Sequence, residues 1–110
     1  MINNIIFESD NLEALKELLK MNLEGKIDVI PIDPPYNTAI DYIKYNDNFN
    51  DENFIRFMKE RLDIAYKLLS NKGVMFIHID ENELYNLKYL CESIFGKENI
   101  KVIMWKKNNE

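Results

Sequence analysis

The residues best suited to chemistry in this sequence form one short segment, Asp33-Pro34-Pro35-Tyr36-Asn37. The two prolines fix φ and remove two backbone N–H donors, so the segment is rigid and presents carbonyl acceptors without local partners. With one carboxylate and one flat ring, this frame suits a planar ligand that carries an exocyclic amine. The carboxylate and a proline carbonyl would accept the two N–H hydrogens while Tyr36 stacks on the ring, which leaves the nitrogen a competent nucleophile. The alternative is a plain Pro-Pro turn in which Asp33 bonds the local backbone.

An alternation of strands and helices has to position this segment. Apolar runs predict strands over residues 4–7, 27–33, 74–80 and 101–105. Apolar residues at helical spacing predict helices over residues 12–19, 51–69 and 84–95. Such alternation indicates a mainly parallel sheet with flanking helices, and ligands of these sheets bind beyond the carboxyl ends of the strands. Asp33 and Asp80 both lie at such ends, which favours the functional interpretation of Asp33 over the plain turn.

Polar residues at the expected helix ends predict how the helices begin. Asp10 with Glu13, and Asp80 with Glu83, have the spacing of capping boxes. Each acid would then accept a hydrogen bond from the first turn of its helix. For Asp80, which also ends an expected strand, a role at the ligand site is the alternative, and we favour the cap.

The expected interior also assigns several single residues. Cys91 is predicted to be core, and His78 to be a satisfied strand histidine. Pro31 falls inside an expected central strand, so either the strand begins at Ile32 or a bulge absorbs the proline. Arg61 is expected to point outward with Glu60. The inward stripe of the 51–69 helix comprises Phe54, Ile55, Met58, Leu62, Ala65, Leu68 and Leu69.

Composition narrows the classes of protein. The 110 residues correspond to one small domain, and a single cysteine excludes a disulfide framework and a cysteine-rich zinc site. No apolar run reaches about 18 residues and no secretory signal opens the chain, so we expect a cytoplasmic protein without a membrane partner. The net charge of −5 argues against a stand-alone nucleic-acid binder, because phosphate neutralisation supplies most of such affinity.

A family resemblance follows from these motifs. Residues 33–36 match the Asp-Pro-Pro-Tyr motif of amino-methyltransferases, which methylate exocyclic amines with S-adenosylmethionine. With the ordered segments 45–49, 73–83, 95–99 and 105–107, the chain resembles the β-class of amino-DNA methyltransferases, and within it the modification subunit of type III restriction–modification systems. The resemblance covers essentially the whole chain. It implies a partial Rossmann-like S-adenosylmethionine-dependent methyltransferase fold, of which residues 1–110 are the catalytic-motif part.

The resemblance also implies roles for single residues. Asp33 and the carbonyl of Pro34 accept the hydrogens of the target amine, Pro35 completes the rigid motif, and Tyr36 stacks on a flipped-out base. Asn37 borders the target pocket, together with the 42–49 loop.

Two acids are expected at the cofactor. Asp10 corresponds to an acid that faces the adenosine of S-adenosylmethionine, and Asp33 belongs to the same cofactor site; for Asp10, a plain helix cap is the alternative. Lys106 and Lys107 either touch phosphate or form solvated surface.

One departure from the family concerns the cofactor. The family holds S-adenosylmethionine on a Phe-x-Gly-x-Gly loop, whereas Gly25, Gly73 and Gly96 are the three glycines here and lie far apart in the sequence. A target-recognition region is missing as well. We therefore expect a fragment of a larger enzyme, inactive in isolation.

The expected function is adenine-N6 methylation of double-stranded DNA in restriction–modification, with a restriction subunit and a homodimer as candidate partners. Alternatives are cytosine-N4 methylation, a non-catalytic truncated remnant, and an amine methyltransferase acting on RNA or protein.

Overall fold

The structure, a computed structural model, describes residues 4–34 and 51–106. The elements follow in the order α1 (Asn11–Lys20), β1 (Ile27–Ile32), α3 (Asp51–Leu68), β2 (Leu69–Ile77), α4 (Leu84–Phe95) and the 3-10 helix η1 (Lys97–Asn99). A helix thus connects the two strands, as the sequence predicts.

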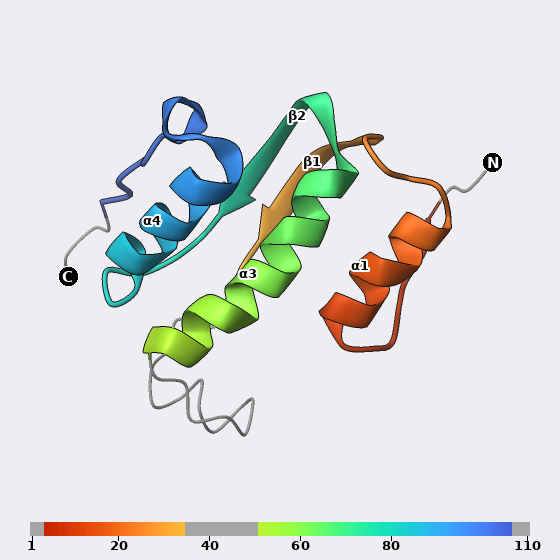
Figure 1. Cartoon of the computed structure of the whole chain (residues 1–110), viewed down its shortest axis with the longest axis horizontal. Coiled ribbons are helices and arrows are strands. Elements are labelled where there is room, and N and C mark those ends of the chain that lie inside the picture. The colour runs from red at the N-terminus through yellow and green to blue at the C-terminus, as the bar shows by residue number, and fades with distance from the viewer. Residues whose placement is uncertain (1–3, 35–50, 107–110) are drawn as a thin grey trace.

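The two strands form a parallel sheet, β1 beside β2. Ile30 pairs with Met75 and Ile32 with Ile77, so both strands end at nearly the same level. Helix α3 returns the chain between them and therefore begins near the edge where the strands end (Figure 1). The prediction of a parallel α/β arrangement with flanking helices is confirmed.

The pairing of the two strands is irregular at its start. Ile27 pairs with Leu69 and Val29 with Val74, so extra residues of β2 are inserted at this point. Gly73 ends the insertion. A Cβ built on it would lie 2.7 Å from Leu69 Cδ1 and 3.0 Å from the carbonyl oxygen of Ile27. The insertion therefore packs tightly against its own strand and its neighbour.

Pro31 lies within β1 opposite Phe76, so both expected ways of accommodating it are wrong. The strand does not begin at Ile32, and the irregularity lies between Ile27 and Val29. Strand residues direct their backbone groups to alternate sides. The carbonyl of Ile32 accepts a bond from His78, on the β2 side, so the nitrogen of Pro31 faces the opposite edge of β1. The proline consequently removes no bond between β1 and β2.

The hydrophobic core lies between one face of the sheet and helices α3 and α4. Ile32, Met75 and Ile77 contribute to it from the strands. The opposite face is open in the described part of the chain: Val29, Val74 and Phe76 are 58%, 47% and 50% exposed. The predicted stripe of α3 is confirmed for the residues that are at most 1% exposed, namely Phe54, Met58, Leu62, Ala65 and Leu68.

Helix α1 packs on α3, on the side away from α4 (Figure 1). It has no fully buried residue, and its leucines are half-buried. Asp10 caps its N-terminus through a 3.3 Å bond from the N–H of Leu12. Glu13 forms a 3.6 Å ion pair with Lys16.

Two predicted strands are wrong. Residues 4–7 and 101–105 have no strand structure, and Ile6 and Trp105 are 95% and 87% exposed. An apolar run forms a strand only where a neighbouring strand accepts its backbone hydrogen bonds, and the described residues offer neither run a neighbour. Within the described residues, no helix is both long and apolar enough to cross a membrane.

Candidate active site

Asp33 and Pro34 follow directly on β1, at the carboxyl edge of the sheet. The side chain of Asp33 is exposed, whereas Pro34 is buried. The N–H of His78 donates a 3.0 Å bond to the carbonyl of Ile32, which extends the pairing to the residue before Asp33. The acid is thus held between a hydrogen-bonded strand and a buried proline, facing solvent. Such a group is available to a ligand that approaches the carboxyl edge.

The remaining residues of the motif, Pro35, Tyr36 and Asn37, lie outside the described residues, as do the 42–49 loop and Lys107. Their roles stay predictions. Lys106 is described and exposed.

The second expected acid at this edge, Asp80, does not cap α4. Its carboxylate accepts bonds of 3.0 Å from the backbone N–H of Asn82 and 3.1 Å from the side-chain amide of Asn82. The N-cap position belongs to Glu83, whose side chain makes no capping bond. The prediction of a capping box is therefore wrong here, because a local turn uses Asp80 before the helix begins.

Glu83 is buried, with 2% of its surface exposed. Its carboxylate accepts a 3.0 Å bond from the side-chain amide of Asn86, and its backbone carbonyl accepts one of 2.9 Å from Leu87. A buried carboxylate is costly unless it is hydrogen-bonded. Glu83 thus ties the turn at the carboxyl edge to the first turn of α4.

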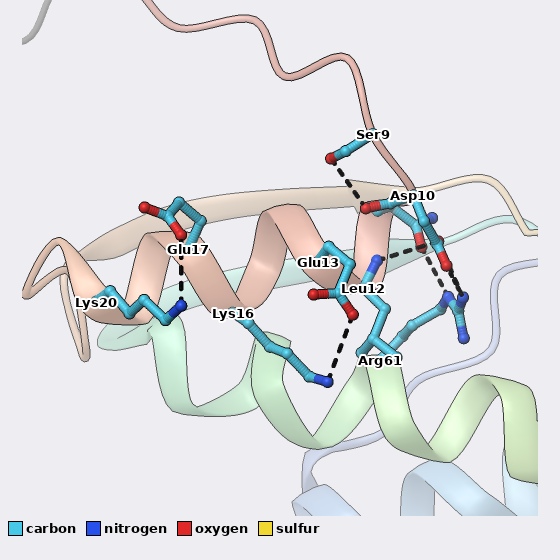
Figure 2. Close-up of polar contacts among 9 residues, drawn as sticks. Ser9, Asp10, Leu12, Glu13, Lys16, Glu17, Lys20 and Arg61 are labelled. Carbon is cyan, nitrogen blue, oxygen red and sulfur yellow. Dashed lines mark hydrogen bonds and ion pairs between the residues drawn. The ribbon is translucent and has the colours of Figure 1, made fainter.

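Asp10 and Arg61 form a polar cluster between the start of α1 and helix α3 (Figure 2). Nη2 of Arg61 lies 3.1 Å and 3.3 Å from the two carboxylate oxygens of Asp10. Nε donates a 2.7 Å bond to the side chain of Asn11, and Nη1 a 3.0 Å bond to the carbonyl of Phe57. The guanidinium also stacks 3.6 Å from the centre of the Phe57 ring. One arginine of α3 thereby holds the N-terminus of α1.

The environment of Asp10 favours its charged form. The N–H of Leu12 and, to a smaller degree, Arg61 lower the pKa of the Asp10 carboxyl against an opposing effect of desolvation. The prediction of a cap is confirmed for Asp10. Its role at the cofactor stays a prediction.

The position of Arg61 corrects the sequence analysis, which expected it to point outward. Its side chain is 11% exposed. The available signal was its place beside the apolar stripe, since Met58, Leu62 and Ala65 lie three, one and four residues away on the same helix. The boundary of an apolar stripe is where a long cationic side chain can bury its stem.

The prediction of a core residue is confirmed for Cys91, whereas the prediction of a strand histidine is wrong for His78. Cys91 is buried in the core, and burial raises the pKa of its thiol to about 11. It is therefore protonated near neutral pH and a poor nucleophile. His78 is exposed just past β2. Among residues 4–34 and 51–106 no cluster of three or more His, Cys, Asp or Glu could hold a metal ion.

The resemblance implies a site for S-adenosylmethionine, and the acceptor chemistry of Asp10 is compatible with one part of that cofactor. Asp10 offers an oriented carboxylate that is still 59% exposed, which suits the neutral hydroxyl or amine donors of an adenosine. The described residues supply no glycine-rich loop for the rest of the cofactor: a Cβ on Gly73 would meet the chain itself, and nothing lies within 4 Å of one on Gly25.

Comparison with known proteins adds to this geometry. A family profile described as DNA methylase matches residues 27–110. The chain is 47% identical to a Haemophilus influenzae protein named "Probable type III restriction-modification enzyme HindVI Mod subunit", over 87% of this chain and 13% of that protein. It is 35% identical to the type III restriction-modification enzyme StyLTI Mod subunit of Salmonella typhimurium, over 98% of this chain and 21% of that protein. It is 39% identical to the type II methyltransferase M.KpnI of Klebsiella pneumoniae, over 86% of this chain and 24% of that protein.

The chain therefore spans between 13% and 24% of the length of these relatives. The profile covers well over half of the chain, including β1, Asp33 and Pro34, α3, β2 and α4. On these grounds, this chain belongs to the DNA methylase family.

Proposed function

We propose that this chain carries the catalytic motif of a site-specific DNA methyltransferase, which methylates adenine N6 in double-stranded DNA as part of a restriction–modification system. The observation that carries the proposal is the exposed carboxylate of Asp33, held at the carboxyl edge of a parallel sheet between β1 and the buried Pro34. The family and the names of the Mod relatives support it.

In this proposal the residues of the chain prepare the amine. Asp33 and the carbonyl of Pro34 accept its two hydrogens, Pro35 keeps the frame rigid, and Tyr36 stacks on the flipped base beside Asn37. When these hydrogens are accepted, the lone pair of the nitrogen points toward the methyl donor. The carboxylate of Asp33 then receives the proton that the amine loses after transfer. S-adenosylmethionine supplies the methyl group when bound, with Asp10 and Asp33 at its site.

The proposal extends to the fold and the assembly. Residues 1–110 are the catalytic-motif part of a methyltransferase domain, and the two-stranded sheet is part of a Rossmann-like sheet. The apolar side chains on its open face support this extension. The cofactor loop and target-recognition region have no counterpart in the 110 residues. DNA, a restriction subunit and a second copy are the proposed partners, in the cytoplasm.

The test measures transfer of a labelled methyl group to double-stranded DNA by the product of the complete reading frame that contains these residues. Asp33→Ala is the variant. Asp28→Ala is its matched control, because Asp28 is an acid of β1, the strand that Asp33 follows, and its carboxylate accepts a bond from Ser70. We expect Asp33→Ala to lower the rate about 10²–10³-fold and Asp28→Ala to retain it. Full DNA methylation by Asp33→Ala would overturn the assigned chemistry.

The same assay separates the alternatives. Digestion of the methylated DNA to nucleosides distinguishes N6-methyladenine from N4-methylcytosine. RNA or protein as the preferred acceptor would favour another amine methyltransferase. Absence of any transfer by the complete product would favour a non-catalytic remnant.

A further inference from the structure

The contacts of Arg61 distinguish it from the other cations of the described residues. Ion pairs elsewhere in residues 4–34 and 51–106 join side chains three or four positions apart on one helix. The pair of Arg61 with Asp10 joins residues 51 positions apart, on α3 and at the start of α1. Its guanidinium has further bonds to Asn11 and to the carbonyl of Phe57. The orientation of the guanidinium is therefore fixed by groups other than Asp10.

Burial in this pair is strongly asymmetric. The side chain of Arg61 is 11% exposed, whereas that of Asp10 is 59% exposed. The exposure of Asp10 leaves lone pairs of its carboxylate oxygens open to a donor from outside the chain. Here the arginine is enclosed between the helices and holds both oxygens of a carboxylate that faces outward (Figure 2). In this pair the carboxylate of Asp10 is a hydrogen-bond acceptor whose orientation is fixed by the buried guanidinium of Arg61.

The charge of the Asp10–Arg61 pair narrows the class of ligand that it could bind. The guanidinium compensates the charge of Asp10, so what the acid offers is a directed hydrogen-bond acceptor rather than a net negative charge. Neutral donors such as sugar hydroxyls or an aromatic amine suit such an acceptor. Adenosine carries both.

We propose that Arg61 is a positioning residue that fixes the Asp10 carboxylate for binding the adenosine part of S-adenosylmethionine. The inference rests on the proposed function, since that function places Asp10 at the cofactor. It adds that Arg61 sets the affinity of this site without touching the cofactor, and that its effect passes through Asp10.

The test is a double-mutant cycle on cofactor binding by the product of the complete reading frame. Dissociation constants for adenosine and for S-adenosylmethionine are measured by calorimetry for Arg61→Gln, Asp10→Asn and the double variant. Asn is chosen as the replacement at position 10 because it still caps a helix. Arg56→Gln is the matched control: Arg56 is an exposed arginine of the same helix, 3.5 Å from Glu52.

We expect Arg61→Gln and Asp10→Asn each to raise both dissociation constants about tenfold, since each loses charge-assisted hydrogen bonds. The double variant should lose no more than either single one, and Arg56→Gln should bind as the parent does. Arg61→Lys should recover part of the affinity, because it keeps the charge without the fork. Circular dichroism confirms that each variant is folded at the temperature used, and Arg61→Lys carries the cycle if Arg61→Gln does not fold.

Unchanged binding by Arg61→Gln, or losses that multiply in the double variant, would overturn the inference. The outcome is separable from that of the proposed function. A protein that methylates DNA but binds adenosine independently of Arg61 leaves the function standing. One that binds adenosine through the pair but transfers no methyl group to DNA leaves the positioning role standing. A parent protein that binds neither ligand contradicts both.

Discussion

The backbone N–H of His78 donates a 3.0 Å hydrogen bond to the carbonyl of Ile32. The bond joins the last residue of β1 to the first residue after β2, so the parallel pairing continues to the edge of the sheet. Asp33 follows at once, and buried Pro34 fixes the chain on its other side. Backbone hydrogen bonding and the buried proline, rather than a network of side chains, therefore fix the position of Asp33 at the edge of the sheet.

Arg61→Ala should lower the free energy of unfolding by about 1–3 kcal/mol, because it removes buried hydrogen bonds and the packing of the side-chain stem. The matched Arg56→Ala should cost about 0.5 kcal/mol or less, since its ion pair with Glu52 is exposed. Urea denaturation of both variants gives the comparison. Equal losses would show that Arg61 contributes no more than a surface charge.

Asp10 should make stability depend on acid pH. Its pKa is lowered in the folded protein, first by the N–H of Leu12 and then by Arg61, from an ordinary value of 3.8. The stabilisation is therefore present above that value and is lost as the pH falls through the folded pKa. The effect is small, because the side chain is 59% exposed and solvent screens it.

Thermal unfolding of the parent and of Asp10→Asn, followed from about pH 6 to about pH 2, measures this contribution. The parent should be the more stable near neutral pH, and the difference should shrink in acid. Asp10→Ala should add a loss that does not depend on pH, because it also removes the cap. A constant difference between the parent and Asp10→Asn would contradict the assigned cause.

The sequence predicted the central elements well, and physical reasons explain the exceptions. Helices α3 and α4 follow from apolar stripes that are wide enough to define a buried face. The runs at 4–7 and 101–105 have strand-forming residues, but strand formation depends on a partner that local sequence does not specify. Pro31 fits within β1 because its nitrogen, which has no N–H to donate, faces the edge that is not paired with β2. The sequence does not specify which edge of β1 is paired.

For the candidate site, local chemistry was easier to predict than long-range contacts. Asp33 at a strand end and Asp10 at a helix cap are both local features, and both are found. The pairing of Arg61 with Asp10 was missed because it depends on how α1 packs on α3. Glu83 was expected as the second member of a capping box, whereas a turn through Asn82 moved it to the N-cap position.

Gly73→Ala should destabilise the protein by about 1–3 kcal/mol through overpacking. The new Cβ would lie 2.7 Å from the side chain of Leu69, which can move, but also 3.0 Å from the backbone oxygen of Ile27, which is held in the sheet. Lys72→Ala is the control, because Lys72 is the residue next to Gly73 and its side chain is exposed, so the substitution meets no such restriction. The two variants are compared by urea denaturation. A Gly73→Ala protein as stable as the control would mean that the start of the sheet adjusts freely.

Cys91 should report on the integrity of the core between α3 and α4. Burial raises the pKa of its thiol from an ordinary value of 9.0 to about 11, so folding favours the protonated form. This contribution to stability is complete below pH 9.0 and is lost as the pH rises toward about 11, because the unfolded chain loses its proton first. The thiol should therefore react slowly with a disulfide reagent at about pH 8 until the core opens.

Two measurements check this behaviour. The rate of thiol modification should rise steeply across the urea transition, in step with circular dichroism. The loss of stability between pH 9.0 and about 11 should be smaller in Cys91→Ala than in the parent, once the other titrating groups are cancelled by taking the difference. Rapid modification of the folded parent would show that solvent reaches Cys91 without unfolding, and the packing of α4 against α3 would then be looser than the burial of Leu87 and Leu90 indicates.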